Sequence, residues 1–101
     1  MGLPDALNLP RLARASPGQP VDLPGPGSGS PGLSVLHLTA RQHGGERACT
    51  HVCLEGTLIL DLPHGDFVQL RAGESYSAPA GQGRTWLPVG PATVLLVWGD
   101  V

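Results

Sequence analysis

Apolar and polar residues alternate in short stretches over most of residues 33–98, and Gly or Pro residues separate these stretches. Alternation with a period of two is typical of strands that bury one face. Short strands that follow one another at roughly 8–12 residues favour an antiparallel sandwich or small barrel. The pattern predicts no helix in this region and places strands at residues 33–40, 47–54, 57–62, 67–71, 75–78, 84–88 and 93–98.

Residues 49–62, CTHVCLEGTLILDL, are predicted to form a hairpin of two strands with a tight turn at Glu55 and Gly56. Because successive side chains of a strand point to opposite faces, Cys49, His51 and Cys53 should share one face. Residues 42–46, QHGGE, are predicted to interrupt the sheet, and residues 63–66, PHGD, to form a turn. Gly90 and Pro91 should separate the last two strands.

Residues 1–32 differ in composition from the rest and hold seven of the 11 Pro and six of the 15 Gly. The apolar pieces are too short and interrupted for a stable helix, although one turn fits at residues 11–14. We therefore expect a Pro/Gly-rich arm (1–32) that lays extended pieces such as residues 21–23 on a domain formed by residues 33–101. The alternative is an arm that binds a partner or is exchanged between two copies.

Charge is sparse, at 14% of residues, and the net charge is −2. Without a basic patch, nucleic acid is not an expected partner. All six cationic residues are Arg, so the chain has no Lys for Schiff-base chemistry or for a phosphate-binding loop.

The two Cys residues lie four positions apart on one predicted strand, about 13 Å between Cα atoms, which is too far for a disulfide. Free thiols suit a reducing compartment. No apolar run approaches the length of a membrane span, about 18 residues, and residues 1–14 do not resemble a signal peptide. A cytoplasmic protein without a membrane partner is the expectation.

Residues 73–84, GESYSAPAGQGR, have the spacing of the second cupin motif: Gly, five residues, Pro-x-Gly, two residues and His. Residues 54–56 resemble the end of the first cupin motif. The chain therefore resembles the cupins, which implies an all-β fold, a jelly-roll or cupin-like antiparallel β-barrel with an internal pocket. The resemblance also implies a homodimer.

The same alignment implies that most of the family's metal ligands are replaced. His43 falls on the first ligand position, Gly45 on the second, Cys49 on the third and Arg84 on the fourth. Arg84 cannot ligate a metal, because its guanidinium is always charged and offers no lone pair. The family's metal centre and the dioxygenase or isomerase activities that depend on it are thereby in question.

A different divalent metal, Zn, Cu, Fe or Mn, is one hypothesis, with His43, Cys49 and His51 as candidate ligands. Residues two apart on a strand, about 6.6 Å between Cα atoms, can share an ion, so Cys53 could replace Cys49 beside His51. The competing interpretation is that no metal binds, because free buried Cys residues usually act as small core hydrophobes and His51 would then lie among them.

Arg84 and His43 at one pocket mouth would suit a carboxylate or phosphate group, which the planar guanidinium can bind with two parallel hydrogen bonds. The alternative is that Arg84 pairs with a carboxylate of the chain: Glu46, Glu55 or Glu74. His51, Tyr76 and Trp86 are further candidate ligand-binding residues, and the two aromatic ones would stack on the ligand. The alternative is that Tyr76 and Trp86 simply fill the core.

Three functions follow. The first is a cupin-like module that binds a small, anionic ligand without the family metal; the second is a metal-dependent enzyme with an altered ligand set; the third is a dimeric interaction module. The sequence has no nucleophile elbow and no glycine-rich phosphate loop before a helix. These observations favour a binding module over an enzyme.

Overall fold

The computed structural model describes residues 6–23 and 32–99. The strands are β1 (Val21–Asp22), β2 (Leu33–Leu38), β3 (Gln42–Gly45), β4 (Cys49–Asp61), β5 (Phe67–Arg71), β6 (Ser75–Ala78) and β7 (Arg84–Trp98). They form one sheet of antiparallel pairs in the order β1, β2, β7, β4 and β5. In addition, β3 pairs with β7, and β6 pairs with β4. In the described ranges this pairing does not close into a ring. The all-β prediction is confirmed.

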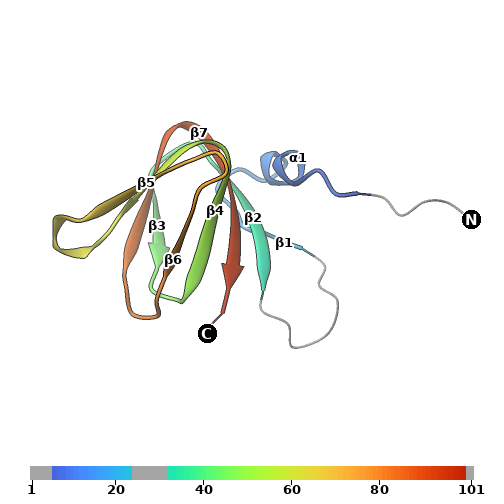
Figure 1. Cartoon of the computed structure of the whole chain (residues 1–101). Helices are drawn as coiled ribbons and strands as arrows, with labels where there is room; N and C mark the ends of the chain where they lie inside the picture. The colour runs from blue at the N-terminus through green and yellow to red at the C-terminus, as the bar shows by residue number, and fades with distance from the viewer. Residues whose placement is uncertain (1–5, 24–31, 100–101) are drawn as a thin grey trace, which may run out of the picture.

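Residues 6–23 of the arm pack along one side of the sheet, where β1 pairs with β2 and a short helix, α1 (Leu9–Arg14), lies against β2 (Figure 1). The side chain of Asn8 accepts a hydrogen bond from the amide of Arg11 and so caps the helix, which buries Ala13. The expectation that this segment forms no stable helix is wrong. Packing against β2 offsets the cost of a helix that would be marginal alone.

The predicted hairpin at residues 49–62 is wrong, because β4 continues through Glu55 and Gly56 as one strand. It pairs with β7 on both sides of this point, with register shifts between Cys53 and Glu55 and between Glu55 and Thr57. Gly56 has a φ of 77° and lets the strand bend there. The first half of β4 also pairs with β6, and the second half with β5.

Two further expected breaks are also absent from the described sheet. β7 runs through Gly90 and Pro91 as a single strand, where two strands were predicted. Residues 42–45, expected to interrupt the sheet, form β3 and pair with the first residues of β7. The predicted turn at residues 63–66 contains one turn of 3-10 helix, η1 (Pro63–Gly65).

Apolar side chains fill the space enclosed by the curved sheet. The buried cluster includes Cys49, Cys53 and Trp86, so the face shared by the two Cys residues points inward as predicted. Both thiols are free and buried, which confirms the absence of an internal disulfide. The aliphatic members of the cluster are Leu36, Leu38, Leu58, Leu60, Leu70, Val94 and Leu96.

In the described ranges, no helix has the length and apolar content needed to cross a membrane.

Substitution at the bend of β4 tests this account of the strand. A Cβ atom on Gly56 would overlap the carbonyl oxygen of Pro91, and the positive φ adds strain for any other residue. Gly56→Ala should therefore lower the free energy of unfolding by at least about 2 kcal/mol in urea titrations. Gly65→Ala is the matched control, since Gly65 has a φ of 79° but open space around the added atom, and should cost about 1 kcal/mol. Equal losses would contradict the close approach of β4 and β7.

Candidate functional site

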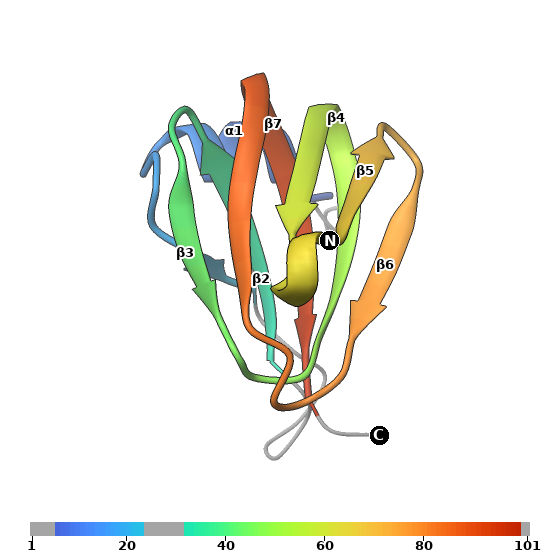
Figure 2. The same ribbon diagram turned by 90° about the vertical axis from the view of Figure 1, so that its left-hand side faces the viewer.

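The connection between β3 and β4 and that between β6 and β7 lie together at the narrow end of the domain (Figure 2). The amide of Gly81 donates a hydrogen bond of 2.8 Å to the carbonyl oxygen of Glu46 and joins the two connections directly. Residues 79–83 belong to the segment that matches the second cupin motif, so the resemblance points to this end of the molecule.

Arg84, the first residue of β7, is only 2% exposed and holds both connections. Its Nη1 donates to the carbonyl oxygen of Arg47 at 2.7 Å, and its Nη2 to the carbonyl oxygen of Gln82 at 2.8 Å. Its Nε is buried and has no hydrogen-bond partner among the described atoms. The guanidinium thus ties the two connections together and keeps one donor unused.

The expected pairing of Arg84 with Glu46, Glu55 or Glu74 does not occur, because backbone carbonyls occupy its outer nitrogens. The ion pair found within the described ranges joins Arg14 to Glu55 and does not involve Arg84. Burial lowers the pKa of Arg84, although the nearby Cys49, Tyr76 and Glu46 act in the opposite direction. A buried guanidinium without a bonded carboxylate carries a desolvation cost that carbonyl dipoles offset only in part.

His51 lies fully buried beside Trp86, and both of its ring nitrogens have partners. Its Nε2 accepts a hydrogen bond of 3.1 Å from the indole of Trp86, while its Nδ1 faces the carbonyl oxygen of Tyr76 at 3.4 Å. The two contacts fit one neutral tautomer, with the proton on Nδ1. Burial, and then the charge of Arg84, lowers the pKa of His51 to about 4.

His43 lies outside this group. On β3 the inward position belongs to Gly44, where an added Cβ would lie 2.7 Å from Cγ of Arg84 and 2.8 Å from the indole of Trp86. Since successive residues of a strand face opposite ways, His43 points outward and is exposed. The structure therefore does not place His43 with Arg84 at a pocket mouth, nor with Cys49 and His51 as a third ligand.

The two thiols are poor nucleophiles in these surroundings. Burial raises the pKa of Cys49 to about 11 in spite of the opposing charge of Arg84, and burial also raises the pKa of Cys53. Cys53 donates weak hydrogen bonds to the carbonyls of Glu55 and Gly56 at the bend of β4. Because the thiolate is the reactive form, this arrangement disfavours thiol chemistry.

The residues present do not fit a metal centre. In the part of the chain that the structure describes, no three His, Cys, Asp or Glu side chains come close enough to hold an ion. His51 has no free lone pair, because Trp86 donates to its Nε2. The charge of Arg84, which acts on His51, would also repel a cation bound at that imidazole.

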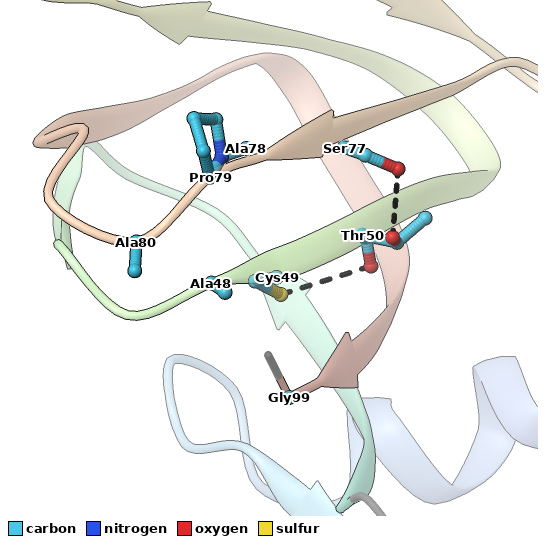
Figure 3. A pocket seen from close by; sticks show the side chains of 8 residues that line it. All are labelled: Ala48, Cys49, Thr50, Ser77, Ala78, Pro79, Ala80 and Gly99. Atoms are coloured by element: carbon cyan, nitrogen blue, oxygen red, sulfur yellow. Dashed lines mark hydrogen bonds between the residues drawn. The ribbon is translucent and has the colours of Figure 1, made fainter. Parts of the chain in front are cut away.

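A cavity of about 370 Å³ opens beside the narrow end, at the edge where β4 and β6 meet (Figure 3). Its walls are uncharged, and the hydroxyls of Thr50 and Ser77 lie 2.8 Å apart across the two strands. Cys49 also lines this cavity, while Arg84 does not. The other lining residues are Ala48, Ala78, Pro79, Ala80 and Gly99.

A second hollow of about 470 Å³ lies between the arm and β4. The charged residues that line it, Arg14 and Glu55, bond to each other at 2.8 Å. Because these two charges are already paired, the hollow offers no unpaired charge to a ligand.

Residue types and spacing indicated Arg84, His51, Tyr76 and Trp86, and the structure brings these four together. Sequence reasoning missed Gln82, whose Oε1 accepts a hydrogen bond of 2.9 Å from the hydroxyl of Tyr76. Its place between the motif's Gly81 and Arg84 was a usable signal. The carbonyl of Arg47 had none, because any residue supplies a backbone carbonyl.

No family model matches the sequence, and no curated protein is similar to it at a significant level. Solved structures give clear matches. A protein from Neisseria meningitidis has a TM-score of 0.76 and 16% identity over 92% of this chain and 97% of that one. A cupin-2 domain-containing protein from Shewanella frigidimarina has a TM-score of 0.73 and 14% identity, over 90% of this chain and 91% of that one.

A hydroquinone 1,2-dioxygenase from Sphingomonas, solved with 4-hydroxybenzoate bound, is also similar, with a TM-score of 0.73 and 13% identity over 100% of this chain and 83% of that one. At these identities the similarity concerns the fold and not the activity. The chain has a small cupin fold, and the predicted resemblance is confirmed at that level.

The His51–Trp86 contact predicts acid sensitivity. A pKa lowered from 6.5 to about 4 means that the unfolded chain binds a proton at pH values where the folded chain does not. Stability is therefore lost as the pH falls below about 6.5, and the loss is complete near pH 4. For His51 alone the free energy of unfolding should drop by about 2 kcal/mol between pH 7 and pH 5.

Urea titrations at the two pH values, with His51→Gln beside the parent protein, measure this contribution. In the variant, the drop in the free energy of unfolding between pH 7 and pH 5 should be about 2 kcal/mol smaller than in the parent protein. His43→Gln, which alters an exposed imidazole, is the matched control and should keep the parent's pH dependence. A parent-like dependence in His51→Gln would contradict the neutral, buried state of His51.

Proposed function

We propose that this cupin-fold protein binds a small anionic ligand, a carboxylate or phosphate compound, at its narrow end without a metal. The supporting observation is the buried guanidinium of Arg84, which bonds two carbonyls, pairs with no carboxylate in the described ranges and leaves Nε unused. An anion would supply the negative charge that this position lacks, and the planar fork of arginine suits carboxylate and phosphate oxygens.

The surroundings of Arg84 support an anion over a cation. His51 is neutral near pH 7 and has its nitrogens occupied, so it neither competes for the anion nor attracts a metal. The cavity beside the narrow end has uncharged walls, so it holds no carboxylate that would repel an anion. Trp86 lies in the core, so Tyr76 is the aromatic residue nearer to an entering ligand.

The thermal midpoint in phosphate tests the anion site. At ten times its dissociation constant, a bound anion adds about 1.4 kcal/mol, or several degrees of Tm in a domain of this size. The rise should saturate with phosphate at constant ionic strength. Arg84→Lys, which keeps the charge but loses the fork, should remove the saturable part.

Arg41→Lys is the matched control, because Arg41 is exposed and lies outside this group. It should respond to phosphate as the parent does. Phosphate also stabilises proteins in general, because it is excluded from their surface. This effect adds a rise in Tm that does not saturate and that is present in every variant. A saturable rise of the same size in Arg84→Lys and in the parent would contradict the proposed anchor.

Metal content separates this function from a metal-dependent enzyme. Protein purified without a metal-affinity tag should contain Zn, Cu, Fe and Mn far below one ion per chain, because the described residues offer no ligand set. Elemental analysis by mass spectrometry measures this directly. One ion of any of these metals per chain, retained after dialysis, would overturn the metal-free assignment.

We also propose that the protein forms a homodimer, as the cupin resemblance implies, and that it lies in the cytoplasm. Sedimentation of the full chain at several concentrations would establish the oligomeric state.

A further inference from the structure

We propose that residues 79–83 form a lid over Arg84, and that the hydrogen bond between the side chains of Tyr76 and Gln82 is the latch that holds the lid closed. The inference rests on the proposed anion site, because a lid at this place acts on ligand binding only if an anion must reach Arg84.

Gln82 is the residue through which the connection is fixed to two strands. Its Oε1 accepts from the hydroxyl of Tyr76 on β6 at 2.9 Å, and its carbonyl oxygen accepts from Nη2 of Arg84 on β7 at 2.8 Å. Its amide also donates to the carbonyl of Pro79 at 3.2 Å, within the connection. Movement of Gln82 would thus break the side-chain contact and free one nitrogen of Arg84 together.

The connection itself contributes little to the core. None of its five residues is buried, and apart from Gln82 they are Pro, Ala and two Gly residues. It contacts the opposite connection through the hydrogen bond from the amide of Gly81 to the carbonyl oxygen of Glu46. A segment held mainly by a few partly exposed hydrogen bonds opens at much lower free energy than the sheet that carries it.

Opening of the lid would change the exposure and the hydrogen bonds of the Arg84 guanidinium. In the closed form the guanidinium is 2% exposed and its outer nitrogens are taken by carbonyls. With Gln82 displaced, Nη2 and Nε become two neighbouring donors on one edge of the fork, which is the geometry that binds two oxygens of a carboxylate or phosphate. Because Pro79 and Ala80 also line the cavity beside Cys49, the same movement would widen that cavity.

Two variants weaken the latch from either side. Tyr76→Phe removes the donor and keeps the ring, while Gln82→Ala removes the acceptor and leaves the backbone carbonyl that Arg84 uses. Loss of one neutral hydrogen bond should raise the opening equilibrium about 2- to 10-fold. Hydrogen exchange of the Gly81 amide, followed by NMR without ligand, should accelerate by this factor in both variants.

If the anion binds only the open form, its apparent dissociation constant falls by the same factor by which opening rises. Phosphate titrations of the two variants should therefore show tighter binding, with a fold-change equal to that of Gly81 exchange. The double variant should match either single variant, since both remove the same bond.

Gln42→Ala is the matched control, because the side chain of Gln42 also makes one hydrogen bond, to the carbonyl of Gly18 in the arm. It should change neither Gly81 exchange nor phosphate affinity. The amide of Gly73, bonded to Cys53, reports opening elsewhere and should exchange at the parent rate in Tyr76→Phe and Gln82→Ala.

Unchanged Gly81 exchange in both latch variants, or equal acceleration at Gly73, would overturn the lid and leave the anion site intact. Faster exchange with unchanged phosphate affinity would also overturn it, since binding would then not require opening. If the parent shows no saturable phosphate response, the proposed function fails, and with it the lid's role in ligand entry.

Discussion

The guanidinium of Arg84 donates one hydrogen bond to each of the two connections that close the narrow end of the domain. One side chain therefore reaches both connections. The charge of Arg84 also lowers the pKa of His51 and opposes the rise in the pKa of Cys49. Burying this charge without a bonded carboxylate is costly, so the arrangement is best understood if an anion completes it.

The hydrophobic pattern predicted the fold class because alternation depends only on which face of a strand is buried. It predicted the inward face of Cys49 and Cys53 for the same reason. The bend at Gly56 was mistaken for a hairpin turn because both features require a glycine with positive φ after a polar residue. Only the pairing of β7 along both halves of β4 distinguishes them, and that pairing is a long-range property.

The candidate site was predicted less completely. The strand β3 was missed because Gly44 and Gly45 have low strand propensity, although Gly44 is the residue type that lets β3 approach Trp86. Without that strand, the alternation that turns His43 outward was not visible. The partners of Arg84 were not predictable either, because backbone carbonyls leave no trace in the sequence. Its position was predictable, since the motif spacing ends on it.

The Nε–H group of Arg84 provides the most direct test of an anion anchored on this residue. A buried Nε–H should give a signal protected from exchange with water in the proton–nitrogen NMR spectrum, assigned by its loss in Arg84→Lys. If an anion binds Arg84, this signal should shift with phosphate, and the shift should saturate at the concentration at which the thermal midpoint saturates. A signal that stays in place while phosphate stabilises the protein in a saturable way would show that the anion does not bind Arg84.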